Sequence, residues 1–139
     1  MILALDTDVI VAALRSPRGA SRRLLGLVRT GQVKAVATVG MLIEYEAVLS
    51  RPVHLAATGL TLGEIGRVLD ALAALVVPVT PHFLWRPQLR DPNDEMVLDA
   101  AVNGGAECIA TFNIADYLPA AARFGIAVER PGDILRRLP

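Results

Sequence analysis

Acidic side chains stand directly after two short apolar segments, where they could bind a metal ion. Asp6 follows the first apolar run, and Asp8 lies two residues further on. Asn113 and Asp116 follow a later run, Cys108–Ala110. If these side chains meet, the pKa values of the acids rise unless a cation compensates their charge. Mg²⁺ and Mn²⁺ are hard cations that take oxygen ligands, so the pattern favours a divalent-metal site, which can activate water and stabilise charge on a phosphate.

Two more acids, Asp91 and Asp94, stand at the start of a predicted helix. Asp91 is a good N-cap, and Pro92 is favoured at the next position, so Asp91 is interpreted mainly as a cap. Asp94 either completes a capping box or binds metal, and both roles stay open. Asp116 has a similar alternative as the cap of a short turn. Asp6 is harder to explain structurally, because an acid at the end of a buried strand is usually placed for a ligand.

A further pair, Glu44 and Glu46, lies on the helix predicted after the second strand. The apolar stripe of this helix consists of Met41, Leu42, Tyr45, Val48 and Leu49. The two glutamates flank the stripe, so both could be solvated, and periodicity does not choose between them.

Basic residues gather in one part of the chain, although the formal net charge is zero. Residues 9–43 carry six basic side chains and no acid, whereas residues 44–139 carry eight basic and twelve acidic ones. A metal nuclease needs acids for its metal and cations for phosphate. The simpler interpretation, favoured when the charge pattern is taken alone, is the solvated face of one helix. The candidates for phosphate contact are Arg15, Arg18, Arg22 and Arg23, and those for orienting a ligand or the attacking water are Thr7 and Thr111.

The elements that must position these residues alternate along the chain. Short apolar runs predict strands at 2–5, 33–37, 76–79, 108–110 and 126–128. Helices are predicted at 9–14, 20–30, 38–50, 91–102 and 133–138. Another helix is predicted to begin at Thr61, where Thr61 and Glu64 can form a capping box, and residues 80–90 are predicted to form a loop. Such alternation implies parallel βαβ units, hence an α/β fold whose parallel, about five-stranded sheet is covered on both faces. The 139 residues suit one domain, and ligands of such sheets bind beyond the carboxyl ends of the strands.

Several other classes of protein are disfavoured. No apolar run approaches the roughly 20 residues of a membrane span, and the first residues lack the basic region of a signal peptide. A single cysteine, Cys108, excludes an internal disulfide and is interpreted as a buried small residue; a cytoplasmic protein is expected. No G-x-G-x-x-G motif and no Ser-His-Asp or Cys-His set is evident. His54 and His82 are expected at the surface, and Trp85 is interpreted as a packing or dimer residue.

Four segments, in order, resemble a PIN-domain protein of the VapC type, the toxin component of bacterial toxin–antitoxin pairs. Residues 5–14, LDTDVIVAAL, are similar to the family's LDTNVLVSAL, and residues 43–52, IEYEAVLSRP, to its EEYREVLSRP. Residues 90–98, RDPNDEMVL, match RDPDDDKVL, and the stretch at 105–118 matches GADYIVTGDKDLL. Each segment is modest alone, but together they are specific and cover nearly the whole chain.

The resemblance implies an α/β/α sandwich with a parallel sheet, a Mg²⁺ or Mn²⁺ site and endoribonuclease activity on RNA. Carried over by position, the acids become Asp6, Glu44, Asp94 and a fourth near Asn113 and Asp116. Glu44 is preferred to Glu46 because the family's acid directly precedes the tyrosine. The resemblance also implies a cognate antitoxin that covers the acidic groove, and often a homodimer; an exposed apolar patch around residues 60–75 is a place to look for such contacts.

Two departures from the family pattern concern the metal site. Asp8 stands where the family usually has asparagine, which adds charge near the metal but keeps an oxygen. Asn113 stands where many members have aspartate, which weakens a second metal position unless Asp116 supplies the carboxylate.

Two other functions fit parts of the sequence. Asp6-Thr7-Asp8-Val9 satisfies the D-x-D-x-[TV] motif of haloacid-dehalogenase-type phosphatases, but the single lysine, Lys34, lies in a predicted strand and no G-D-x-x-x-D follows. A catalytically weak PIN-like module that binds RNA or protein is suggested by Asn113. Hydrolysis of phosphate esters without RNA cleavage would favour the first, and absence of metal binding the second.

Overall fold

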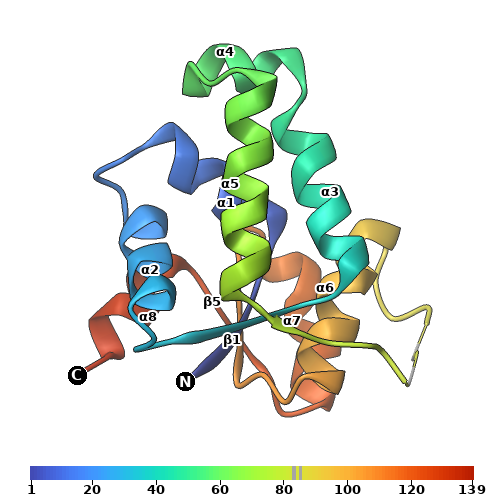
Figure 1. Cartoon of the computed structure of the whole chain (residues 1–139). Coiled ribbons are helices and arrows are strands. Elements are labelled where there is room, and N and C mark those ends of the chain that lie inside the picture. Colours follow the sequence, from blue (N-terminus) through green and yellow to red (C-terminus); the bar gives the residue numbers. More distant parts are fainter. Residues whose placement is uncertain (83, 85) are drawn as a thin grey trace.

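The computed structural model describes residues 1–82, 84 and 86–139, so the interpretation of Trp85 lies outside the described residues (Figure 1). All pairings in its five-stranded sheet are parallel, and the strand order is β3-β2-β1-β4-β5. The strands are β1 (Ile2–Leu5), β2 (Lys34–Ala37), β3 (Val77–Pro78), β4 (Cys108–Ala110) and β5 (Ala127–Glu129). The predicted α/β fold with a parallel sheet is confirmed.

Helices cover the sheet on both faces. The first group, α1 (Thr7–Arg15), α2 (Ala20–Arg29), α3 (Val39–Leu49), α4 (Pro52–Thr58) and α5 (Leu62–Leu75), connects β1 to β2 and then β2 to β3. The second group is α6 (Pro92–Asn103), which contacts β1, β2 and β4, and α7 (Ile114–Arg123), which contacts β5. Right-handed crossovers that run in opposite directions along a sheet place their helices on opposite faces, which gives three layers. The last helix, α8 (Pro131–Arg137), contacts α2, and Figure 1 shows α3 and α5 side by side with α4 at their upper end.

The chain reverses its direction across the sheet between β1 and β4. Successive strands first add on the β2 side of β1, and after β3 the chain crosses to β4 on the other side. Leu5 of β1 lies opposite Ala110 of β4, so the next residues, Asp6 and Thr111, leave the sheet side by side. Ligands of parallel sheets bind at such a switch point, and the topology therefore places Asp6 where a ligand is expected.

The core consists of small aliphatic side chains and two tyrosines. β1 and β4 are buried on both faces, and Leu3, Ala4 and Ile109 are fully buried, as expected for central strands of a parallel sheet. Tyr45 and Tyr117 are also buried, and their hydroxyl groups reach toward the end of β1. Within the described residues, no helix has the length and apolar character that a bilayer span would need.

Two helices were not predicted. The first follows the helix predicted at 38–50: Arg51 is the N-cap and Pro52 the first residue of α4, the position that proline favours. The second is α7, which contains Pro119 and begins after Asn113. Proline inside a helix is unfavourable, so the sequence pattern gave no helix there.

The segment before α6 is held along that helix by three side chains spaced four residues apart. The Glu95 carboxylate accepts hydrogen bonds from the backbone N–H groups of Gln88 and Leu89 at 2.6 and 2.7 Å. Asp99, which is buried, forms an ion pair with Arg86 at 2.7 Å. The Asn103 side-chain oxygen accepts from the N–H of His82 at 3.2 Å. The predicted loop at 80–90 is therefore tied to α6 over several turns.

Candidate metal centre

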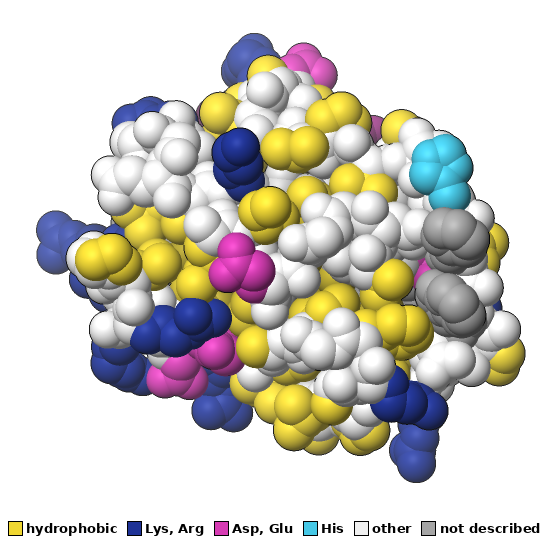
Figure 2. Space-filling view, turned by 90° about the horizontal axis from the view of Figure 1, so that it is seen from below, with side chains coloured by type: hydrophobic (Ala, Val, Ile, Leu, Met, Phe, Trp, Pro, Cys, Tyr) yellow, Lys and Arg dark blue, Asp and Glu magenta, His cyan; other side chains and the backbone are white. Residues whose placement is uncertain are grey.

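A cleft of about 630 Å³ lies where β1 and β4 end. Its wall comes from the starts of α1 and α6, from α3 and from α4. The charged and imidazole side chains that line it are Asp6, Asp8, Arg15, Glu44, Arg51, His54, Asp91 and Asp94. Five acids thus share one hollow with two arginines. By contrast, the lower end of the molecule, where the N-terminus lies, shows acidic side chains spread over separate spots among apolar ones (Figure 2).

Asp6 is buried and is held by two hydrogen bonds. One carboxylate oxygen accepts from the N–H of Thr7 at 2.8 Å, which makes Asp6 the N-cap of α1. The other accepts from the hydroxyl group of Thr111 at 2.7 Å. Burial, together with the charge of Asp8, raises the pKa of Asp6 to about 6. Asp6 therefore caps α1, a structural role that was not predicted. Its buried carboxylate nevertheless keeps a raised pKa.

Asp8 has one satisfied and one unsatisfied oxygen. Its Oδ2 accepts from the N–H of Phe112 at 3.0 Å and from the side-chain amide of Asn113 at 3.1 Å. Its Oδ1 is buried and has no hydrogen-bond partner among the described residues. Burial raises the pKa of Asp8, and the charge of Asp94 adds to this effect. A buried carboxylate oxygen without a donor is costly unless a ligand binds it.

Asp94 is positioned by a buried tyrosine. The hydroxyl of Tyr117 on α7 donates to Asp94 Oδ1 at 3.0 Å, and this contact accounts for the side chain better than the capping box that was considered. Burial, against the effect of the Tyr117 hydrogen bond and with the help of the charges of Asp6, Asp91 and Asp116, raises the pKa of Asp94 to about 6. Asp91 caps α6 through the N–H of Asn93 at 2.9 Å and also lines the cleft.

The structure separates the two glutamates of α3. Glu44 is half-buried and lines the cleft. Glu46 is exposed and faces a shallow hollow between α3 and α5. Glu44, preferred on the resemblance alone, is thus the one that lies with Asp6 and Asp94.

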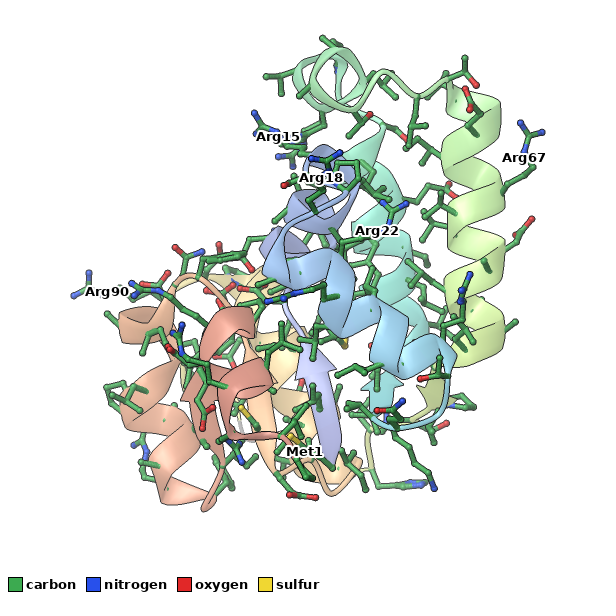
Figure 3. The ribbon with its side chains drawn as sticks, turned by 90° about the vertical axis from the view of Figure 1, so that its left-hand side faces the viewer. Met1, Arg15, Arg18, Arg22, Arg67 and Arg90 are labelled. Atoms are coloured by element: carbon green, nitrogen blue, oxygen red, sulfur yellow. The ribbon has the colours of Figure 1, made fainter. Side chains whose placement is uncertain are left out.

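Asp116 does not line the acidic cleft. It is exposed in the first turn of α7 and lines a neighbouring groove of about 470 Å³ that also contains Asp94 and Arg90. Figure 3 shows Arg90 projecting outward from the ribbon. Asn113, by contrast, does line the acidic cleft. Of the two residues considered for the fourth position, the structure therefore brings only Asn113 into the cleft.

Arg15 is the one arginine of the predicted set that lines the cleft. Arg18 and Arg23 are exposed, and neither belongs to the lining. Arg22 donates to the carbonyl of Ala13 at 3.0 Å and lines an apolar groove between α2 and α5. Figure 3 shows Arg15 and Arg18 near the turn between α1 and α2, with Arg22 further along α2.

The cleft contains two residues that the sequence did not single out. Arg51 and His54 both belong to the unpredicted helix α4 and its cap. His54 was expected at the surface far from the acids, and this was wrong: it is half-buried, and its Nδ1 is buried without a partner in the described part of the chain. Arg51-Pro52, as a helix start, could have predicted α4, but the packing of α4 against α1, which brings both residues to the cleft, is a contact between distant segments.

The residues present fit a divalent cation. Among the described residues, no group of three His, Cys, Asp or Glu side chains is arranged so that it could hold a metal ion as it stands. Mg²⁺, however, usually keeps several waters and is bound by one or two carboxylates plus substrate phosphates, not by a closed protein cage. The orphaned Oδ1 of Asp8 and the raised pKa values of Asp6 and Asp94 are what such a cation would relieve.

Comparisons with known proteins agree with this architecture. The search of curated proteins found no match. A chain in the crystal structure of VapBC2 from Rickettsia felis bound to a DNA fragment from their promoter is similar in fold, with a TM-score of 0.61 and 15% identity over 94% of this chain and 98% of that one. The sequence profile of the PIN domain matches residues 3–115. Since that match covers far more than half of the 139 residues, the chain belongs to the PIN domain family.

Proposed function

We propose that this protein is an endoribonuclease that depends on Mg²⁺ or Mn²⁺ and is the toxin of a toxin–antitoxin pair. The observation that carries the proposal is the convergence of Asp6, Asp8, Glu44 and Asp94 on one cleft at the switch point of the sheet. Membership of the PIN domain family and the fold shared with a VapBC2 chain support it. The proposed site of action is the cytoplasm.

In the proposed mechanism one or two of these four acids would bind the cation directly, and the others would bind it through waters that it keeps. A bound Mg²⁺ or Mn²⁺ supplies a lowered pKa for water and charge stabilisation at the scissile phosphate. Thr111 fixes one oxygen of Asp6, and Tyr117 fixes one oxygen of Asp94, so that each carboxylate is held in place beside the cleft. These two residues are positioning residues.

Two arginines of the cleft are proposed to bind the RNA backbone. Arg15 and Arg51 line the same cleft as the acids, and neither forms an ion pair within the described residues. Arginine matches phosphate geometry with two parallel donors. They would hold the phosphate against the metal site, and Thr7, which also lines the cleft, would contact the same substrate.

The two departures from the family pattern meet in space. Asp8 and Asn113 are hydrogen-bonded to each other at 3.1 Å. The family usually has asparagine at position 8 and aspartate at position 113. In this chain the acid and the amide have therefore exchanged positions across the contact. We therefore propose that Asp8 supplies the carboxylate that Asn113 lacks, in place of Asp116.

Calorimetric titration with Mn²⁺ and a cleavage assay on single-stranded RNA together test the proposal. We expect saturable Mn²⁺ binding and RNA cleavage that EDTA abolishes. Hydrolysis of p-nitrophenyl phosphate without RNA cleavage would instead indicate a haloacid-dehalogenase-type phosphatase. RNA binding without metal binding or cleavage would indicate the catalytically weak module.

Replacing Tyr117 with phenylalanine is expected to weaken Mn²⁺ binding about 10-fold, at the lower end of the range for residues that orient metal ligands. The hydroxyl stabilises the ionised form of Asp94, so its loss raises the pKa of that carboxyl further. Because Mn²⁺ needs the ionised carboxyl, the pH midpoint of binding should move upward. Calorimetry between pH 5 and 8 measures the shift. An unchanged midpoint, with the protein folded, would remove Tyr117 from the site.

A cognate antitoxin that covers the cleft, and a homodimer, are the proposed protein partners. The apolar surface expected around residues 60–75 is present in part, since Leu62 and Leu75 are exposed and Leu75 borders the groove between α2 and α5.

A further inference from the structure

Phe112 exposes an aromatic ring beside the acidic cleft. It follows β4 directly, and 42% of it is exposed. Among the described aromatic residues, Tyr45 and Tyr117 are buried and Phe124 is half-buried, so Phe112 is the exposed one. Exposed apolar residues are common on protein surfaces, and the environment of the ring decides whether this one has a role.

The ring borders a hollow of about 480 Å³ that adjoins the cleft. Asn113 lines both the hollow and the acidic cleft, so the two are neighbours. The backbone N–H of Phe112 is bonded to Asp8 at 3.0 Å, which fixes this residue relative to the proposed metal ligands. Leu118 adds a second exposed apolar side chain to the same hollow.

Arg130 lines the same hollow and forms no ion pair within the described residues. The other two arginines of this C-terminal region are engaged: Arg136 is paired with Asp133, and Arg137 is paired with Glu129 at 2.8 Å. A free guanidinium beside an exposed ring can contact phosphate while the ring stacks on a base. Asp116, also in the hollow, would repel a second anion but can accept hydrogen bonds from the N–H groups of a base edge.

We propose that Phe112 and Arg130 form a subsite for one unpaired nucleotide that flanks the scissile phosphate, with its base stacked on Phe112 and its phosphate on Arg130. This inference rests on the proposed function, because it takes RNA as the ligand of the adjoining cleft. It makes single-stranded RNA the substrate class, since a base can lie on the ring only when it is not paired.

Fluorescence anisotropy with labelled single-stranded RNA decamers tests the subsite, with Ca²⁺ replacing Mn²⁺ to keep the RNA intact. Phe112→Ala is expected to raise the Kd about 10-fold, within the range for loss of base–aromatic stacking. Phe112→Tyr keeps the ring and should bind within about twofold of wild type. Ile43→Ala is the matched control, because Ile43 is 65% exposed on α3 and does not line the hollow.

The same decamers carrying one abasic residue complete a double-mutant cycle. In the wild type, one abasic position beside the cleavage site should weaken binding about as much as Phe112→Ala does, and in Phe112→Ala that position should cost nothing further. Equal abasic penalties in both proteins, unchanged binding of Phe112→Ala, or no RNA binding by the wild type would each overturn the subsite. If the cycle holds but Mn²⁺ produces no cleavage, the subsite stands and the nuclease proposal fails.

Discussion

Replacing Asp6 with asparagine is expected to abolish Mn²⁺-dependent RNA cleavage and, in EDTA, to raise the free energy of unfolding at pH 7.5 by about 2 kcal/mol. The two effects have one cause. Asp6 is buried, with 6% of its surface exposed, and its pKa is about 6 in the folded protein against an ordinary value of 3.8. Asparagine retains an acceptor for the N–H of Thr7, so the cap of α1 is preserved.

The sign of the stability effect follows from proton linkage. The folded state holds the Asp6 proton more tightly than the unfolded state does, so ionisation destabilises the fold. The penalty is absent below pH 3.8, grows as the pH rises toward 6, and is complete above it. The gain from Asp6→Asn should therefore disappear at pH 4, which urea unfolding at pH 4, 6 and 7.5 would reveal.

Glu46→Gln is the matched control for Asp6→Asn. Glu46 is exposed on α3 and lies outside the cleft, so neither cleavage nor stability should change. Cleavage by Asp6→Asn at the wild-type rate would remove Asp6 from the mechanism. A loss of stability at pH 7.5 would show that its hydrogen bonds outweigh the cost of its buried charge.

Exchanging the residues at positions 8 and 113 is expected to restore the RNA cleavage that the single substitution Asp8→Asn removes. Asp8→Asn should reduce cleavage about 100-fold or more, because it removes the carboxylate with the unpartnered oxygen. The double variant Asp8→Asn with Asn113→Asp returns an acid to the same contact, 3.1 Å across, and should recover to within about 10-fold of wild type. Single-turnover cleavage and Mn²⁺ titration of wild type, both single variants and the double variant measure the coupling.

The outcome for the double variant decides which residue supplies the fourth carboxylate. If it is as inactive as Asp8→Asn, position 8 itself is required. If Asp8→Asn is fully active while Asp116→Asn is not, the carboxylate comes from Asp116, despite its place outside the cleft.

The sequence predicted the sheet and its edge better than the walls of the cleft. Buried strands and the residues after them are local patterns, so Asp6 and Thr111 could be assigned to strand ends from the sequence. The pairing that brings them together, Leu5 opposite Ala110, depends on strand order, which the alternation of elements does not determine. Asp94 was found with its role open, and the buried Tyr117 that orients it was missed because its helix contains Pro119.

Other features of the site depend on how distant segments pack. Periodicity could not separate Glu44 from Glu46, since both flank one stripe and only the position of α5 makes one side a cleft and the other a shallow hollow. His54 reaches the acids because α4 folds back over α1, which no local pattern records. Asp116 was predicted only as a fourth acid near Asn113. In the structure it lies in the first turn of α7 and shares a hollow with Asn113, but it does not line the acidic cleft.

The hydrogen bonds between α6 and the segment before it allow the amino-acid sequence of that segment to change during evolution. Glu95 and Asn103 hold it through backbone N–H groups of Gln88, Leu89 and His82, which every residue except proline offers. Among the described residues of the segment, Arg86 is the one held through its side chain. Homologous proteins could therefore carry different side chains along this segment, and so different walls for the groove that contains Arg90, without losing the backbone ties to α6.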